Sequence, residues 1–415
     1  MRILMATTGS TGDLQPFLAL GRRLLDHGHD VHLAAQDAHA ARCEEAGVPF
    51  ASIGVTDQVY QRILDLMPRV LAETDFVEEE RMVIEQTVEI QRHALPELRK
   101  LAREADLVLH SPLAIGGVVA ARAEGTPDIS VTYTWPPQST RKYAPSNMDH
   151  GPLLNKIAWA MARRAIGRAT DPPLNTVVTA AGLTRWRNIV FEARRSALLD
   201  LIPISPTVLP PTRSAGPVTL STGYWFFDEP GYTPPPDLAA FMVGSAPLVL
   251  GFGSTNGHDE RMLATTVAET LSGLGHRTVV QGDFIRRAGI DLGPDVFVAG
   301  RVPHDWLFSR AAGVVHHGGV GTTAAAFRAG VPQAIVSYQG DQPQWGRQVA
   351  RLCVGPAHCS HERFDAAWLD AALRVLANDK PMAERARTLG RAVRGEDGTG
   401  QAVRAIERVH LSLVR

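Results

Sequence analysis

The residues from Val315 to Thr323, which read Val-His-His-Gly-Gly-Val-Gly-Thr-Thr, have the types and spacing of an anion-binding site. Their glycines let the main chain approach a ligand closely, and the two histidines supply polar ring nitrogens. Thr322 and Thr323 begin a predicted helix whose free N–H groups and positive dipole end favour a negative charge. Gly330 and Pro332 then end this helix as a C-cap and a breaker. The segment therefore predicts a cradle for a pyrophosphate group.

The elements that must position this cradle alternate between short apolar runs and longer helical patterns, which is typical of parallel sheets built from strand–helix units. In the first half the expected strands are Arg2–Thr7, Asp30–Ala35, Leu107–His110 and Ile129–Thr134, with a long helix over Glu78–Glu104 that is interrupted near Pro96. In the second half the expected strands are Leu248–Phe252, Arg277–Gln281, Val296–Ala299, Gly313–His316 and Gln333–Ser337, and the expected helices are Glu260–Leu274 and Thr322–Ala329.

Prolines divide this alternation in two. They cluster between positions 203 and 247, where they disfavour any long helix or central strand, so a linker is expected there. We expect an α/β protein of two doubly wound, Rossmann-like domains: residues 1–215, a linker at 216–240, residues 241–395, and a last helix at 396–415 that crosses back to the first domain. Sheets of this kind bind ligands beyond the carboxyl ends of their strands. The glycine-rich loops Thr8–Asp13 and Gly251–Ser254 are therefore expected to face one cleft.

Composition excludes several classes of protein. The chain has 415 residues with 42 basic and 43 acidic side chains, so the electrostatic footprint of a nucleic-acid-binding protein is missing. Three cysteines without a Cys-x-x-Cys pair, and an N-terminus that turns polar early, favour a reducing cytoplasm over secretion. Cys353, His358, Cys359 and His361 match no common metal-site spacing, so no metal is expected. Monomer and homodimer are both compatible with the sequence.

Membrane contact has two interpretations. No apolar stretch approaches the ~20 residues that a spanning helix needs. The segment Leu153–Ala169 is a basic amphipathic helix pattern, which suits peripheral contact with a membrane surface. A helix packed on its own domain is the simpler interpretation.

Taken in order, the motifs resemble the GT-B nucleotide-sugar glycosyltransferases, in particular the bacterial branch that is similar to sterol glucosyltransferases and glycopeptide-antibiotic glycosyltransferases. The residues that carry the resemblance are Gly9–Pro16, Ser221–Trp225, Gly251–Ser254, Arg301–Phe308, His316–Thr323 and Gly340–Gln342. The resemblance covers nearly the whole chain. It implies an acceptor-binding first domain, a second domain that binds a UDP- or TDP-sugar, and a reaction that needs no metal or other cofactor.

The resemblance also implies the residues of a donor site. The charge that develops on the departing diphosphate would be neutralised by Ser254, His317, Thr322 and the backbone of Gly319, Val320 and Gly321. Val302 would present its backbone to the nucleotide base, and Arg301 a guanidinium plane where plant relatives have Trp.

Three further residues near the donor site, Asp341, Gln342 and His316, have functional or structural interpretations. Asp341 and Gln342 would hydrogen-bond the sugar hydroxyls, whereas a helix cap is the simpler role because Pro343 stands where a helix begins. His316 lies one residue before His317 on an extended segment, so its side chain points to the other face and is expected to be structural.

For the acceptor side, Asp13 is the candidate general base. The glycopeptide-antibiotic and sterol-type enzymes have Asp at this place, and a carboxylate suffices if proton transfer comes late. The simpler role is the N-cap of a helix over Leu14–Asp26. Phe76, Tyr133 and Trp135 are candidate lining of an apolar acceptor pocket.

We therefore expect an inverting hexosyltransferase, with glucose as the expected hexose, that acts on a hydroxyl of a lipophilic natural product or sterol-like acceptor. A sugar-nucleotide epimerase or a non-catalytic sugar-nucleotide-binding protein of the same fold fits the donor cradle equally well. A nicotinamide-dependent oxidoreductase fits poorly, because Ser10 and Thr11 break the Gly-x-Gly-x-x-Gly fingerprint.

Overall fold

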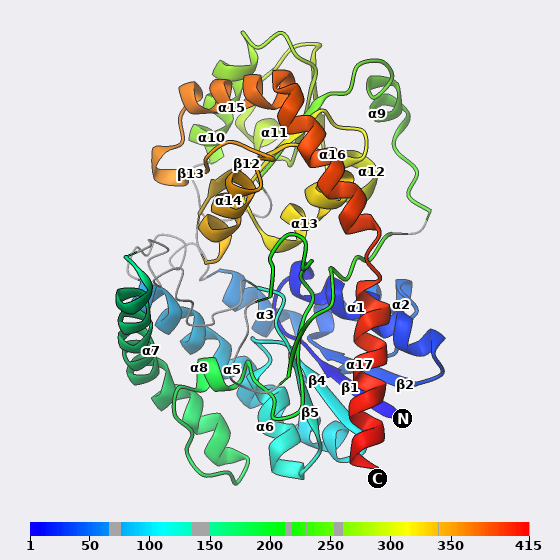
Figure 1. Cartoon of the computed structure of the whole chain (residues 1–415), viewed down its shortest axis with the longest axis vertical. Coiled ribbons are helices and arrows are strands. Elements are labelled where there is room, and N and C mark those ends of the chain that lie inside the picture. The colour runs from blue at the N-terminus through cyan, green and yellow to red at the C-terminus, as the bar shows by residue number, and fades with distance from the viewer. Residues whose placement is uncertain are drawn as a thin grey trace. The chain divides into compact units, whose positions relative to one another are not determined.

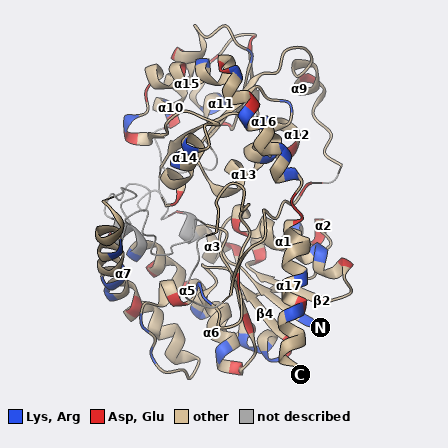
Figure 2. Ribbon diagram, in the orientation of Figure 1, with Lys and Arg blue, Asp and Glu red and all other residues tan. Residues whose placement is uncertain are grey.

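The structure is a computed structural model that describes residues 1–65, 76–134, 150–211, 218–229, 231–252, 260–338 and 340–414 (Figure 1). The chain forms two compact units. The first comprises residues 1–206, 210–227 and 397–415, and the second comprises residues 207–209 and 228–396. Basic and acidic positions are interspersed over both units (Figure 2).

The first unit is built on a seven-stranded parallel sheet in the order β3-β2-β1-β4-β5-β6-β7. The strands are β1 Arg2–Ala6, β2 Asp30–Ala35, β3 Phe50–Ser52, β4 Leu107–His110, β5 Asp128–Val131, β6 Asp200–Ile202 and β7 Thr219–Ser221. Strand β7 lies inside the proline-rich region, where the prolines flank the strand and leave its ladder intact. The strand order reverses between β1 and β4, which places the switch point beside the end of β1.

Helices cover both faces of this sheet. They are α1 Thr11–Asp26, α2 Ala40–Glu45, α3 Asp57–Leu64, α5 Phe76–Arg103, α6 Ile115–Glu124, α7 Pro152–Ala180, α8 Ile189–Glu192 and α17 Gly398–Leu413. Alternate residues of β1 face opposite cores: Ile3 and Met5 pack with α1 and α17, whereas Leu4 and Ala6 pack with α5 and α6. The last helix, α17, thus belongs to the first unit, as the sequence predicted.

The expected interruption of the long helix near Pro96 is wrong, because α5 continues from Phe76 to Arg103 with Pro96 inside it. A proline inside a helix costs about 3 kcal/mol or more. Burial of Ile84, Leu95 and Leu98 in the core against α6 offsets this cost. None of the described helices is both long enough and apolar enough to cross a membrane.

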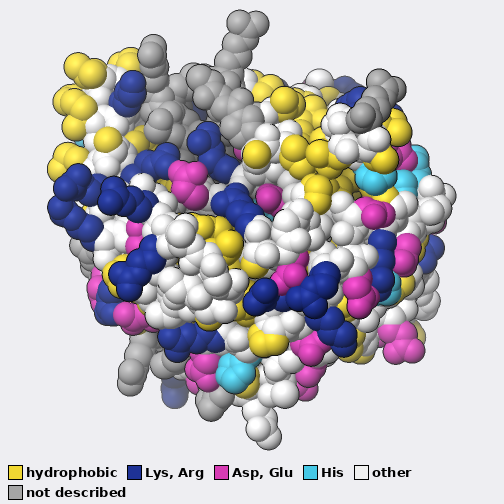
Figure 3. All heavy atoms as spheres, turned by 90° about the horizontal axis from the view of Figure 1, so that it is seen from below, with side chains coloured by type: hydrophobic (Ala, Val, Ile, Leu, Met, Phe, Trp, Pro, Cys, Tyr) yellow, Lys and Arg dark blue, Asp and Glu magenta, His cyan; other side chains and the backbone are white. Residues whose placement is uncertain are grey.

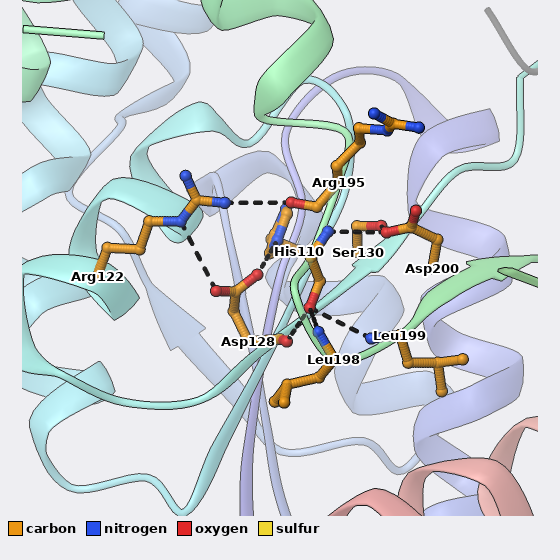
Figure 4. A network of polar contacts seen from close by, with 9 residues as sticks. His110, Arg122, Asp128, Ser130, Arg195, Leu198, Leu199 and Asp200 are labelled. Atoms are coloured by element: carbon orange, nitrogen blue, oxygen red, sulfur yellow. Dashed lines mark hydrogen bonds and ion pairs between the residues drawn. The ribbon is translucent and has the colours of Figure 1, made fainter. Parts of the chain in front are cut away.

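A buried polar network joins β4, β5 and β6 on one face of the first sheet (Figure 4). His110 lies 3.2 Å from Asp128 through Nε2, and the Ser130 hydroxyl donates a 2.6 Å hydrogen bond to Asp200. The guanidinium of Arg122 lies 3.8 Å from the Asp128 carboxylate and donates to the Arg195 carbonyl. These contacts fix the segment before β6 against the sheet, whereas the buried Nδ1 of His110 has no hydrogen-bond partner among the described residues.

The second unit repeats the architecture with a six-stranded parallel sheet in the order β10-β9-β8-β11-β12-β13. The strands are β8 Leu248–Gly251, β9 Thr278–Gln281, β10 Val296–Ala299, β11 Gly313–His316, β12 Gln333–Ser337 and β13 Cys359–Ser360. The helices are α9 Pro236–Phe241, α10 Glu260–Leu271, α11 Phe284–Ala288, α12 His304–Phe308, α13 Val320–Ala329, α14 Gln342–Arg351, α15 Ala366–Asn378 and α16 Lys380–Arg394. Its strand order reverses between β8 and β11, where His316 pairs with Gly251.

Candidate active site

The donor-side candidates gather where β11 ends in the second unit. His316 is fully buried, and its Nδ1 accepts a 3.0 Å hydrogen bond from the Gly318 N–H. Its Nε2 therefore carries the proton and donates to Gln333 Oε1 on β12 at 2.8 Å. Burial lowers the pKa of His316 to about 3. This neutral ring ties β11 to β12 and fixes the turn that follows.

His317 points its ring into the glycine-rich turn. A side chain at Gly319 would collide with the His317 ring, and Gly318 adopts a φ of +89°. The Nδ1 atom of His317 is buried and has no hydrogen-bond partner among the described residues. Burial lowers the pKa of His317 to about 4, so the free protein holds the ring neutral. A buried polar atom without a partner is rare in folded proteins and marks a place for a ligand or water.

The N-terminus of α13 lies directly after this turn. Gly319 is the N-cap residue, and no side chain of the described residues caps the helix. The Thr323 hydroxyl and N–H both bond to the Gly319 carbonyl at 2.9 Å, which tightens the first turn. The N–H groups of Val320, Gly321 and Thr322 belong to the first turn, whose N–H groups have no partner within the helix. They carry the helix's positive partial charge of roughly half an elementary charge.

His304, which lies within the motif Arg301–Phe308 but was not named as a candidate on its own, is a further candidate for the donor side. It begins α12 after the N-cap Pro303, and its ring stacks on Phe308 with centroids 4.6 Å apart. Burial and the neighbouring His317 and Arg301 lower the pKa of His304 to about 4. The position of His304 at the start of a helix that follows a strand is the sequence feature that could have identified it as a candidate.

Arg301 and Val302 lie between β10 and α12. The Val302 carbonyl accepts a 2.8 Å hydrogen bond from the Gln281 side chain on β9, so this carbonyl is already occupied. Arg301 is exposed and pairs with Glu229. The ion pair with Glu229 thus holds the Arg301 guanidinium, which was expected to contact the nucleotide base.

Asp341 and Gln342 stand at the start of α14. Asp341 is the N-cap residue by position, but its side chain makes no cap hydrogen bond. Its Oδ2 instead accepts a 2.9 Å hydrogen bond from the indole N–H of the fully buried Trp345. Asp341 thus stands at the helix cap, as the simpler interpretation expected, but its side chain holds the Trp345 indole rather than a backbone N–H of the helix. Gln342 packs against Gly318, and its Oε1 accepts from the Tyr338 N–H at 2.7 Å.

The acceptor-side candidate Asp13 lies at the switch point of the first sheet. Helix α1 begins at Thr11 with Ser10 as its N-cap, so the expected N-cap role of Asp13 and the expected helix start at Leu14 are wrong. Asp13 is the third helical residue of a capping box. Its Oδ2 accepts hydrogen bonds from the Ser10 N–H at 2.7 Å and the Ser10 hydroxyl at 2.8 Å.

The other carboxylate oxygen of Asp13 is held by Tyr133. The Tyr133 hydroxyl donates to Asp13 Oδ1 at 2.8 Å, and only 4% of Tyr133 is exposed. Burial raises the pKa of Asp13, while the hydrogen bonds from Tyr133 and Ser10 act in the opposite direction. The pKa of Tyr133 is raised well above its ordinary value by burial and by the Asp13 charge, so it stays a donor. Tyr133 thus orients Asp13, and its role in lining the acceptor pocket stays a prediction.

The loop before Asp13 is fixed by three donors that converge on one carbonyl. The Gly9 carbonyl accepts from Gln36 at 2.8 Å and from His39 and Tyr60 at 3.0 Å each. Gly9 adopts a φ of +121°, and a side chain there would collide with the Asp13 carboxylate. The loop conformation therefore requires glycine.

Three sequence candidates fall outside what the structure describes. Ser254 and Trp135 lie outside the described residues, and for Phe76 the structure describes only the backbone at the start of α5. Among the described residues, no three His, Cys, Asp or Glu side chains are grouped as metal ligands would be.

Comparison with known proteins agrees with this architecture. Residues 3–99 match the glycosyltransferase family 28 N-terminal domain, and residues 265–399 match the C-terminal domain of erythromycin biosynthesis protein CIII-like proteins. O-mycaminosyltylonolide 6-deoxyallosyltransferase of Streptomyces fradiae is 32% identical over 98% of this chain and 97% of its own length. Sterol 3-beta-glucosyltransferase of Aspergillus terreus is 30% identical over 98% of this chain, which spans only 30% of that protein. The glycosyltransferase VinC in complex with DTDP is similar in fold, with a TM-score of 0.70 and 20% identity over 99% of this chain and 100% of that one.

Two parallel-sheet α/β units with these matches define a glycosyltransferase of the GT-B fold. The chain belongs to the glycosyltransferase family whose members include the antibiotic glycosyltransferases and the sterol glucosyltransferases.

Proposed function

We propose that this glycosyltransferase is an inverting, metal-independent enzyme that moves a hexose from a UDP- or TDP-sugar to a hydroxyl of a lipophilic natural product or sterol-like acceptor. The observation that carries the proposal is the Nδ1 of His317, which has no partner among the described residues, beside the N-terminus of α13, which no described side chain caps. Neutral imidazole and free N–H groups are suited to a diphosphate without a metal.

In the proposed reaction the acceptor oxygen bonds to the anomeric carbon as the bond from that carbon to the diphosphate oxygen breaks. The acceptor proton passes to Asp13, and the nucleoside diphosphate leaves with the bonding electron pair. A single displacement of this kind inverts the anomeric configuration. The raised pKa of Asp13 makes its carboxylate a stronger base than a solvent-exposed aspartate.

The donor side would stabilise the leaving group. His317 and the N–H groups of Val320, Gly321 and Thr322 would bond the diphosphate oxygens, with Ser254 as a further donor. Asp341, oriented by Trp345, and Gln342 would bond the sugar hydroxyls. Val302 would meet the nucleotide base through its backbone, and Arg301 would do so on leaving its ion pair with Glu229. His304, whose pKa is lowered in part by His317, would be a further contact of this donor site.

The identities of donor and acceptor rest on the relatives. One relative is named as a deoxyallosyltransferase of O-mycaminosyltylonolide, others as glucosyltransferases of sterols, and VinC is bound to DTDP. These names support a natural product or a sterol as the acceptor, and the VinC complex supports a thymidine-linked donor; a uridine-linked donor stays a prediction.

The direct test incubates purified protein with UDP-glucose or TDP-glucose, with and without a panel of sterol and macrolide alcohols, in chelator. We expect nucleoside diphosphate to be released only when an acceptor is present, together with a product heavier by one hexose whose anomeric NMR coupling shows inversion. A reversible change of the sugar nucleotide without acceptor would support the epimerase instead. Binding without turnover would support a non-catalytic sugar-nucleotide-binding protein.

A further inference from the structure

The first half of α7 has a face that the fold does not bury. Leu153 is 71% exposed, Leu154 57%, Ile157 47% and Met161 68%. The spacing from 153 to 157 to 161 places these residues on one side of the helix. Four large apolar side chains gathered on one helix face constitute an exposed apolar patch rather than isolated surface residues.

The same helix buries its apolar residues elsewhere, so the exposure is specific to its N-terminal part. Ile166, Leu174, Val177 and Val178 all lie in the core that α7 shares with α5. The helix therefore packs on its own unit through these residues, as the simpler interpretation of the sequence expected. Its apolar face at 153–161 stays exposed.

The charges that α7 itself carries between Pro152 and Thr170 have one sign. Lys156, Arg164 and Arg168 are exposed and form no ion pair with another described residue, whereas Arg163 is paired with Glu192. From Pro152 to Thr170 the helix carries no acidic residue, and Figure 2 shows the N-terminal part of α7 with basic positions only. On the face of the molecule in Figure 3, basic and acidic side chains lie interspersed, and hydrophobic side chains gather at the upper right and along the upper left edge.

We propose that this face of α7 docks on the surface of an anionic phospholipid bilayer. Leu153, Leu154, Ile157 and Met161 would enter the boundary between headgroups and acyl chains, and Lys156, Arg164 and Arg168 would bond lipid phosphates. From Leu153 to Met161 the helix rises about 12 Å, which suits a helix that lies on the surface. The proposal does not rest on the proposed sugar transfer.

A second copy of the chain fits this face less well. Symmetric pairing presents the same patch on both partners. Because the patch contains Lys156, Arg164 and Arg168 and no acidic residue, two copies would bring like charges together. An anionic bilayer offers both the apolar layer and the opposite charge.

The test measures co-sedimentation of the full chain with vesicles of equal parts phosphatidylcholine and phosphatidylglycerol, and with pure phosphatidylcholine vesicles. We expect binding to the anionic vesicles that weakens as salt increases. Arg164→Glu with Arg168→Glu is expected to weaken binding by at least about tenfold, and Leu153→Ser with Ile157→Ser and Met161→Ser by about tenfold or more. Circular dichroism would confirm that each variant is folded.

Helix α17 offers a matched control, because Leu411 is 57% exposed and Arg408 is exposed one turn away. Arg408→Glu with Leu411→Ser should bind like the unmodified chain. The proposal is overturned if the unmodified chain ignores anionic vesicles, or if the α7 and α17 variants bind alike. It is also overturned if the α7 substitutions abolish a concentration-dependent dimer in sedimentation, since a second copy would then cover the face.

Discussion

The Tyr133 hydroxyl donates a 2.8 Å hydrogen bond to Asp13 Oδ1 across 120 residues of sequence. Ser10 occupies the opposite carboxylate oxygen through its N–H and its hydroxyl. The carboxylate is thus oriented from both sides, and its rotation would cost hydrogen bonds at both oxygens.

Replacement of Tyr133 by phenylalanine tests this orientation. Because the Tyr133 hydrogen bond lowers the Asp13 pKa, its loss raises that pKa further. The base form of Asp13 is lost as pH falls through its pKa, so the acid limb of the rate–pH profile should move to higher pH. We expect kcat to fall about tenfold near neutral pH. An unchanged profile would show that Tyr133 does not act through Asp13.

Asp13→Asn separates catalysis from helix capping. We expect transfer to fall by about 10² to 10⁴, with nucleoside diphosphate affinity unchanged and a stability loss of about 1 kcal/mol from the weakened hydrogen bonds to Ser10 and Tyr133. Asp365→Asn is the matched control, because Asp365 caps α15 through the Trp368 N–H at 2.8 Å. Near-full turnover by Asp13→Asn would remove Asp13 as the base.

Gly319→Ala tests whether the His317 ring needs the space left by the missing side chain of Gly319. The added methyl group would collide with the His317 ring and displace it from the donor site. We expect nucleoside diphosphate affinity, measured by calorimetry, to fall about tenfold, comparable to the loss of a hydrogen bond to a charged group. Gly273→Ala serves as the control, since a side chain there would meet no atom within 4 Å. Equal affinities for both variants would contradict the role of the turn.

Trp345→Phe removes the indole N–H that holds Asp341 at 2.9 Å. We expect a KM for the donor sugar raised several-fold, with little change in the affinity for free nucleoside diphosphate, because Asp341 is assigned to the sugar. Because Trp345 is fully buried and phenylalanine is smaller, we also expect a stability loss of about 1 to 3 kcal/mol. Trp368→Phe, at a partly buried tryptophan packed with Phe364, controls for the loss of an indole. Equal donor KM values in both variants would contradict the assignment.

The central strands could be predicted from the sequence because buried parallel strands are continuous apolar runs. Strands β10, β11 and β12 coincide with the expected Val296–Ala299, Gly313–His316 and Gln333–Ser337. Strands β3, β6, β7 and β13 have only two or three residues each, too few to show a pattern.

The candidate site was only partly predictable. Local motifs located Asp13 and the His317 turn, since glycine spacing and helix starts are local properties. The contact of Tyr133 with Asp13 comes from the register of β1, β4 and β5, which the sequence does not specify. The sequence did not reveal Ser10 as the N-cap, because the third helical residue of this capping box is Asp13 rather than the usual Glu or Gln.

The most direct measurement is the affinity of uridine diphosphate and thymidine diphosphate, by calorimetry without divalent cations, for the unmodified chain and for His317→Ala. The unmodified chain should bind at least one of the two, and His317→Ala should weaken that binding about tenfold or more, while Asp13→Asn leaves it unchanged. Failure of the unmodified chain to bind either diphosphate, or equal binding by His317→Ala, would contradict a diphosphate site at the end of β11.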